Sequence, residues 1–233
     1  MDKQDFIQWA EKLQDGYVLS DSTREHLSTV DLVAIVGPTG VGKTSIMRKL
    51  DVPMVIGDVT REQREGEKNG KDYLFRTDYL DIVTEIKAGV YVQFVISRSG
   101  EFYGTRSYSY PDEGSCTMAI VASVIPMFKQ LGFRSVKQFY IMPPSYKEWM
   151  RRLSEQSRSD LLNRIDEARQ SVSSAANNPD EYTFILNDDI DQAAKDIQTA
   201  LDGNEIDPHR LQLAQDTANI ILEYIGDDMD LAL

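Results

Sequence analysis

Apolar runs alternate along this chain with segments in which apolar residues recur at helical spacing. A continuous apolar run between turn residues predicts a buried strand, whereas recurrence every three to four residues predicts an amphipathic helix. The runs that predict strands lie at residues 32–36, 54–56, 91–96, 117–122, 136–142 and 182–186. Helical spacing and capping signals predict helices at residues 77–88, 124–131 and 190–201. They also predict a helix that begins after Ser145, a long helix that ends at about residue 176, and a helix that begins at Pro208. This alternation predicts an α/β fold of three layers around a mostly parallel sheet, whose ligands bind at the carboxyl ends of the strands.

A second pattern interrupts this alternation. The strand at 91–96, the turn at Ser99–Gly100 and the strand at 101–105 predict a hairpin, and residues 73–76 extend it. The helix before it has Thr77 as its expected cap and Gly89 as its stop. These elements indicate a small antiparallel subdomain inserted into the α/β unit.

Amphipathic segments flank the core at both ends. Residues 1–30 predict one helix and a connector, which we expect to pack on the parent domain rather than to serve as a partner-binding arm. The segment from Asp207 predicts a helix with one apolar stripe, docked on the domain or on a second subunit. The residues of that stripe are Leu211, Ala214, Ala218, Ile221, Leu222 and Ile225.

A phosphate-binding loop lies between the first strand and the helix that follows it. Residues 37–44 read GPTGVGKT, which is the pattern G-x-x-x-x-G-K-[ST] in its required setting between strand and helix. Glycines let the backbone N–H groups converge on an anion at a helix N-terminus. Lys43 is expected to reach the β- and γ-phosphates of a nucleotide, and the Thr44 hydroxyl to bind Mg²⁺. The motif therefore predicts a P-loop NTPase fold.

Composition narrows the range of partners and compartments. The net charge of −13 argues against nucleic acid as a main partner, because a phosphate backbone needs a basic surface. Cys116 is the single cysteine, so an internal disulfide is excluded, a reducing compartment is the default, and a core role is favoured over a nucleophilic one. The polar start and the lack of a long apolar run predict a cytoplasmic protein without a membrane segment. We expect a monomer or a homodimer.

Five segments, taken in order and with their approximate spacing, resemble the guanylate kinase family. The segment at 59–73 is the most specific, because a P-loop alone indicates only a superfamily. The segments are GPTGVGKTS at 37–45, VTREQREGEKNGKDY at 59–73, FYGT at 102–105, MPPS at 142–145 and FILNDDID at 184–191.

The resemblance implies a domain at 31–203 between helical extensions at 1–30 and 204–233. Within it, an insert at about 57–110 would hold the nucleoside monophosphate, and a short lid would lie at about 152–164. The implied reaction is the transfer of the γ-phosphoryl group from Mg·ATP to GMP or dGMP, which gives ADP and a nucleoside diphosphate.

The resemblance also implies a role for particular residues. Lys43, Arg61, Arg152 and Arg164 would be catalytic, with the last two reaching the transferred group from the lid. An arginine-rich site suits phosphoryl transfer, which needs positioning and charge neutralisation more than acid–base groups. The ATP phosphates and adenine would be bound by Gly37, Pro38, Thr39, Gly40, Val41, Gly42, Lys43, Thr44, Ser45 and Asn187. The acceptor would be bound by Arg61, Arg64, Tyr73, Gln93, Tyr103 and Thr105, and the metal by Thr44.

The chain departs from the family where the guanine base would be read. The strand at 118–122 carries no carboxylate, although the family has two aspartates there. A family glutamate aligns with Gln93 or Phe94, and a family serine aligns with Gly57, beside Asp58. A site without carboxylates for the guanine N1–H and N2 groups need not discriminate strongly, so we expect relaxed or altered base choice.

The expected lid is shorter than in the family. The arginine that the family has in the middle of the lid aligns here with Gln156, which leaves Arg158 as a substitute. Asp58, Asp188 and Asp189 are the acids open to support Mg²⁺. Two alternatives to a nucleotide kinase remain open: a kinase of a ribose-phosphate compound, and a non-catalytic binding module with a guanylate kinase-like fold. The intact Gly42-Lys43-Thr44 argues against the module.

Overall fold

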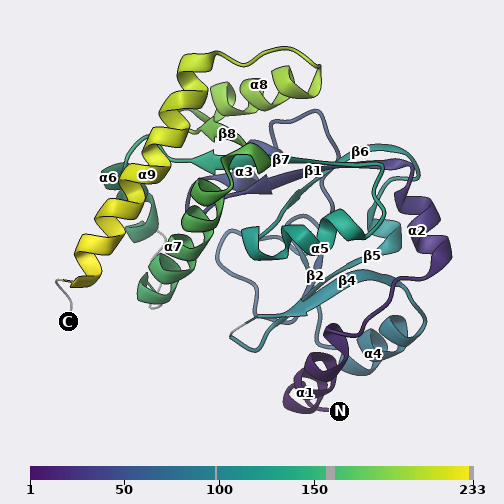
Figure 1. Ribbon diagram of the computed structural model, residues 1–233. Coiled ribbons are helices and arrows are strands. Elements are labelled where there is room, and N and C mark those ends of the chain that lie inside the picture. The colour runs from purple at the N-terminus through teal and green to yellow at the C-terminus, as the bar shows by residue number, and fades with distance from the viewer. Residues whose placement is uncertain (98, 156–160, 231–233) are drawn as a thin grey trace. The chain divides into compact units, whose positions relative to one another are not determined.

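The computed structural model describes residues 1–97, 99–155 and 161–230, and its contacts group into two compact units (Figure 1). One unit, called here the insert unit, comprises residues 1–31, 54–116 and 129–135. The other, called the loop unit, comprises residues 32–53, 117–128 and 136–233. The domain limits expected at 31–203 and 57–110 stay predictions. Residues 1–31 group by their contacts with the insert unit.

A four-stranded sheet forms the centre of the loop unit. Its strand order is β6 (Gly114–Ala119), β1 (Val30–Val36), β7 (Ser135–Met142) and β8 (Thr183–Leu186). Strands β7 and β8 run parallel, in a register that pairs Phe139 with Thr183 and Met142 with Leu186. The end of β1, from Val33 to Val36, is almost fully buried, as expected for a strand covered on both faces. The expected α/β class is confirmed.

Helices pack around this sheet, with α8 and α7 on opposite sides of it in Figure 1. Ser145 caps α6 (Tyr146–Ser154) by accepting a bond from the Glu148 N–H, and Asp189 caps α8 (Ile190–Leu201) through the Gln192 N–H. The edge strand β8 and α7 (Leu161–Asn177) both pack against α9 (Pro208–Asp230). Shorter elements are α3 (Lys43–Met47), α5 (Ile125–Gln130), η2 (Ala122–Val124) and η3 (Pro179–Glu181).

A second four-stranded sheet forms the insert unit. Its order is β3 (Leu74–Phe75), β2 (Asp58–Val59), β5 (Phe102–Arg106) and β4 (Tyr91–Ile96), followed by η1 (Ser107–Ser109). Strand β5 is antiparallel to both β2 and β4, whereas β2 and β3 run parallel. The register of β4 on β5 shifts by one residue between Tyr91 and Gln93, which is a β-bulge.

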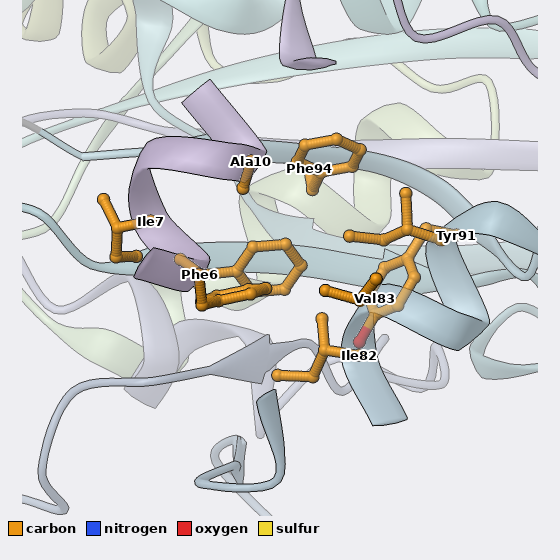
Figure 2. Close-up of a cluster of buried hydrophobic side chains, with 9 residues drawn as sticks. Phe6, Ile7, Ala10, Ile82, Val83, Tyr91 and Phe94 are labelled. Atoms are coloured by element: carbon orange, nitrogen blue, oxygen red, sulfur yellow. The ribbon is translucent and has the colours of Figure 1, made fainter. Parts of the chain in front are cut away.

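The N-terminal helix α1 (Lys3–Gln14) closes one face of this sheet (Figure 2). Its apolar side pairs with α4 (Tyr79–Lys87) and the β4–β5 hairpin in a cluster of buried side chains. Lys3 Nζ also contacts Glu101 Oε1 at 2.6 Å, and Tyr17 OH donates to the Tyr91 carbonyl at 2.6 Å. The cluster consists of Phe6, Ile7, Ala10, Ile82, Val83, Ile86, Tyr91, Phe94 and Phe102.

The structure corrects four local expectations. Residues 1–30 form two helices rather than one, because Ser20 caps a separate α2 (Asp21–Leu27) by accepting from the Thr23 N–H. The apolar run at 54–56 makes only a single bridge at Met54, and β2 follows it. Asp78, not Thr77, is the N-cap residue of α4. The strand expected at 117–122 starts and ends three residues earlier, since η2 occupies residues 122–124.

No helix in the described part of the chain is long and apolar enough to cross a bilayer.

Candidate functional site

The glycine-rich loop at residues 37–45 is fitted closely to the sheet ends around it. Gly37 has φ 138° and Gly42 has φ 93°, a region that residues with a Cβ rarely adopt. A Cβ at Gly37 would lie 2.6 Å from the Ile141 carbonyl oxygen, and one at Gly42 would lie 2.7 Å from Asn187 Nδ2. The loop therefore needs glycine at both positions for its backbone shape and for space.

Lys43 folds back over this loop. Its Nζ donates to the carbonyl oxygens of Gly37 at 2.6 Å and Pro38 at 2.8 Å. Burial of the ammonium group and then the positive charge of Arg164 lower the pKa of Lys43 to about 8. A half-buried cation with a lowered pKa gains from a nearby anion, because the anion favours the charged form.

Three side chains brace the loop from other elements of the same unit. Trp149 Nε1 of α6 donates to the Thr39 carbonyl at 2.8 Å, and Arg164 Nη2 of α7 donates to Thr39 Oγ1 at 2.9 Å. Asn187 Nδ2 donates to the Val41 carbonyl at 2.6 Å. Trp149 is not among the residues predicted from the sequence, where the available signal is a tryptophan within the largely polar segment at 146–154.

Arg152 connects α6 to the residue after β8. Its Nη2 donates to the Asn187 carbonyl at 3.1 Å, and its Nε donates to Glu148 Oε1 at 2.8 Å. Arg152 and Arg164 thus both lie in the loop unit, one bonded to Asn187 and one to the loop itself. The centre of the expected lid, with Gln156 and Arg158, lies outside the described residues.

Thr44 lies exposed at the end of the loop, and Ser45 is half-buried beside it. Among the described residues, no cluster of three or more His, Cys, Asp or Glu side chains could hold a metal ion. A hydroxyl and the phosphates of a nucleotide are oxygen ligands of the kind that Mg²⁺ prefers, with water completing its shell. The residues present therefore fit Mg²⁺ held chiefly by a bound nucleotide, with Thr44 as the protein ligand.

Two of the three acids considered for Mg²⁺ are held by ion pairs. Asp58 is 1% exposed and bonds Arg106 at 2.7 Å and Arg76 at 3.0 Å. Asp188 accepts two bonds from Arg210, which lower the pKa of its carboxyl group. The third, Asp189, caps α8. These contacts give all three acids structural partners.

In the insert unit, Arg61 is surrounded by an acid and aromatic rings. Its Nη1 and Nη2 each donate to one oxygen of Glu67 at 2.7 Å, and Tyr103 lies close enough to influence the pKa of its guanidinium group. Its guanidinium carbon lies 5.1 Å from the Tyr73 ring centroid and 5.5 Å from that of Phe75. Burial opposes the charge, but the interactions with Glu67 and Tyr103 together outweigh it and raise the pKa of Arg61.

Tyr73 and Tyr103 lie next to each other and next to Arg61. Their ring centroids are 6.2 Å apart in an edge-to-face arrangement, and burial raises the pKa of Tyr73. Arg64 is exposed, and its backbone N–H donates to Glu67 Oε2 at 2.8 Å. The structure therefore brings Arg61, Tyr73 and Tyr103 into one cluster, with Arg64 on the adjoining exposed turn.

A row of polar side chains runs through the same sheet. Gln93 Nε2 donates to Thr105 Oγ1 at 3.3 Å, and Thr105 Oγ1 lies 2.8 Å from Tyr110 OH. All three side chains are buried. Phe94 instead belongs to the apolar cluster under α1. The bulge in β4 thus decides between the two aligned residues: Gln93 shares its face with Thr105, and Phe94 does not.

Comparison with known proteins agrees with this geometry. Residues 29–204 match the guanylate kinase family. The guanylate kinase of Caulobacter vibrioides is 33% identical over 181 residues, which cover 71% of this chain and 81% of that protein. The guanylate kinase of Schizosaccharomyces pombe is 28% identical over 196 residues, which cover 77% and 95%. The chain belongs to the guanylate kinase family.

A solved guanylate kinase structure supports the fold. The crystal structure of guanylate kinase from Anaplasma phagocytophilum superposes with a TM-score of 0.51 at 21% identity, covering 78% of this chain and 89% of that one. The guanylate kinase match includes both the loop and the arginine–tyrosine cluster, whereas α1, α2 and α9 lie outside it.

Proposed function

We propose that the protein is an ATP-dependent nucleoside monophosphate kinase that transfers the γ-phosphoryl group of ATP to GMP, dGMP or a related nucleotide. The observation that carries this is the loop at 37–45, in which Lys43 Nζ bonds the carbonyls of Gly37 and Pro38. Membership of the guanylate kinase family supports the reaction class. A cytoplasmic location and a monomeric or homodimeric state stay predictions from the sequence.

The donor site lies in the loop unit. Backbone N–H groups of the loop would bind the ATP phosphates, and Lys43 would leave its two carbonyls for the β- and γ-phosphates. Arg164, bonded to Thr39, would place a second positive charge there. Mg²⁺ brought with ATP supplies charge neutralisation of the phosphate oxygens, with the Thr44 hydroxyl as its protein ligand. Asn187 holds the loop carbonyl of Val41 and would border the adenine.

The acceptor site lies in the insert unit. Arg61 and Arg64 would bind the 5′-phosphate through charge-assisted bonds, and Tyr73 and Tyr103 would each donate one O–H. An oxygen of that phosphate attacks the γ-phosphorus as the bond to the β,γ-bridging oxygen breaks, and ADP leaves. No general base is required for this step, since a phosphate oxygen is already anionic at pH 7.

Base choice is the point at which we expect this protein to differ from its family. The row Gln93–Thr105–Tyr110 offers amide and hydroxyl groups, which both donate and accept. A carboxylate only accepts hydrogen bonds, so it favours a base edge with two donors, as guanine has. An amide both donates and accepts, so it can also bind the edges of other bases. GMP and dGMP remain the best single candidates, with preference among the nucleotides relaxed.

One assay tests both parts of the proposal. ADP release is measured with ATP, Mg²⁺ and each ribo- and deoxynucleoside monophosphate in turn, for the wild type and for Lys43→Ala. We expect turnover in the wild type, loss of turnover in Lys43→Ala while the protein stays folded, and a shallow preference for GMP. Equal turnover in the variant would refute the kinase. A steep GMP preference would refute relaxed base choice, and silence with all acceptors would favour the non-catalytic binding module.

A further inference from the structure

Arg210, near the start of α9, donates several hydrogen bonds to the turn that joins β8 to α8. Its Nη1 and Nη2 donate to the two Asp188 carboxylate oxygens at 3.1 and 2.9 Å, and Nη2 also donates to the Leu186 carbonyl at 3.1 Å. Its Nε donates to Asp196 Oδ2 of α8 at 2.8 Å. The Arg210 side chain is 17% exposed and that of Asp196 is 8% exposed, so the bond between them is largely shielded from water, whereas the Asp188 side chain is 42% exposed.

The residue between these two anchor points is Asn187. Its backbone N–H donates to the Met142 carbonyl at 2.7 Å, and its side chain donates to the Val41 carbonyl at 2.6 Å. Asn187 is 1% exposed, and its Nδ2 lies where a Cβ at Gly42 would come within 2.7 Å. The position of Asn187 therefore limits the path of the loop at Val41 and Gly42.

We propose that Arg210 is a positioning residue of the donor site, which acts on the phosphate-binding loop through Leu186, Asn187 and Asp188. The proposal rests on the proposed function in one respect, namely that ATP binds at residues 37–45. Arginine suits this role because one planar group reaches two carboxylates and a carbonyl in three directions. Lysine has a single ammonium group and cannot make the same set of bonds to both carboxylates and the carbonyl.

The rest of α9 supports the same region. The ring of Tyr224 stacks on that of Tyr146 of α6 at a centroid distance of 5.0 Å. Helix α6 in turn carries Trp149, which bonds Thr39, and Arg152, which bonds the Asn187 carbonyl. Since α9 lies beyond the segment that matches the family, this support of the loop is a feature of the chain's own C-terminal extension (Figure 1).

The first test compares Arg210→Gln with Gln212→Ala in the full-length protein. Gln212 is exposed on the same helix, and its Nε2 donates to Asp216 Oδ1 of that helix, so it serves as the matched control. We expect Arg210→Gln to raise the KM for ATP about tenfold and to leave the KM for the acceptor within twofold, while the control changes neither. A lower melting temperature with both KM values unchanged would show a merely structural role and would overturn the proposal.

The second test does not depend on catalysis. Hydrogen exchange is measured on the loop amides at 41–44 in the wild type, Arg210→Lys and Asp188→Asn, all without nucleotide. We expect faster exchange at these amides in both variants, with exchange in β2–β5 unchanged. Faster exchange confined to α9 and the β8–α8 turn would overturn the proposal, whether or not the wild type proves to be a kinase. Lysine at 210 is the mild variant that keeps the charge if glutamine prevents folding.

Discussion

The guanidinium group of Arg61 donates two parallel hydrogen bonds of 2.7 Å to the carboxylate of Glu67. This is the bidentate geometry in which arginine binds carboxylate most strongly, and it uses the same fork that would bind a phosphate. Burial raises the pKa of Glu67. The bonds from Arg61 and from the Arg64 N–H together lower it by more than burial raises it, so the pKa lies below its usual value. Glu67 would therefore compete for Arg61 with the acceptor phosphate that we propose binds there.

Glu67→Gln is predicted to tighten binding of the acceptor phosphate. The amide removes a negative charge next to the phosphate site, which we expect to lower the Kd about threefold to tenfold, or about 1 kcal/mol. The melting temperature is expected to fall, because Arg61 is 9% exposed and loses its charge partner. Calorimetric titration with GMP measures the first effect, and Glu65→Gln is the control, since Glu65 is an exposed acid of the same turn. Weaker binding in Glu67→Gln would contradict the prediction.

ATP binding is predicted to weaken as the pH rises above about 8. Lys43 has its pKa lowered to about 8 in the free protein by burial and by Arg164, so its charge is present below that pH and lost above it. Bound phosphates favour the charged form, which raises the pKa in the complex and makes binding take up a proton at alkaline pH. The Kd for ATP should be constant below about pH 7 and rise up to tenfold per unit above pH 8.

Calorimetry in buffers of different ionisation enthalpy checks this proton uptake directly. We expect near-zero uptake at pH 6.5 and an uptake approaching one proton at pH 9, with the dependence absent in Lys43→Ala. A binding heat independent of buffer at pH 9 would rule out the titration of Lys43.

Gln93→Glu is predicted to restore a preference for guanine. A carboxylate on this face of β4 would accept two bonds from the guanine N1–H and N2 groups, and bonds to charged groups contribute about 1.5–3 kcal/mol each. The hydroxyl of Thr105, 3.3 Å from Gln93 Nε2, can donate to the new carboxylate. We expect kcat/KM for GMP to rise at least tenfold relative to CMP and UMP.

The matched control for this change is Gln130→Glu, which adds the same charge at an exposed position of the insert unit. It should leave the nucleotide preference unchanged. If Gln93→Glu shifts all acceptors equally, Gln93 does not face the base.

Local motifs were predictable from the sequence, but long-range contacts were not. The strand and loop at residues 32–44 and the helix at 190–201 were identified because their signals lie within a few neighbouring residues. The run at 54–56 was wrongly expected to form a strand, since three apolar residues also suit a buried connector. The second N-terminal helix was missed although Ser20 and Thr23 carry a capping signal.

The candidate site shows the same division. Sequence named Arg61, Tyr73 and Tyr103, which the structure brings together. It could not choose between Gln93 and Phe94, because that choice depends on a bulge set by pairing with β5. The roles of Trp149 and Arg210 could not be predicted, because their partners are distant in the sequence. Trp149 bonds Thr39, 110 positions away, and Arg210 bonds Asp188, 22 positions away.

Phe6→Ala is predicted to loosen the insert unit and with it the acceptor site. Phe6 is fully buried (Figure 2), and its ring centroid lies 5.5 Å from that of Phe102 at the start of β5. Truncation of a buried phenylalanine costs about 3–5 kcal/mol. We expect a lower denaturant midpoint and a raised KM for the acceptor, with the KM for ATP unchanged. Val18→Ala, at a residue that is 78% exposed, is the control and should change neither value.

Gly42→Ala is predicted to weaken ATP binding without unfolding the protein. Alanine there has a strained positive φ, which costs about 1–2 kcal/mol, and its Cβ meets Asn187 Nδ2 at 2.7 Å. Gly203→Ala separates these effects, since Gly203 has φ 79° with nothing within 4 Å of a Cβ. Both variants should lose similar stability from the backbone term, but only Gly42→Ala should also displace Asn187 and lose ATP affinity by tenfold or more. Equal ATP affinity in the two variants, measured by titration below the melting temperature, would show that the loop tolerates a side chain against Asn187.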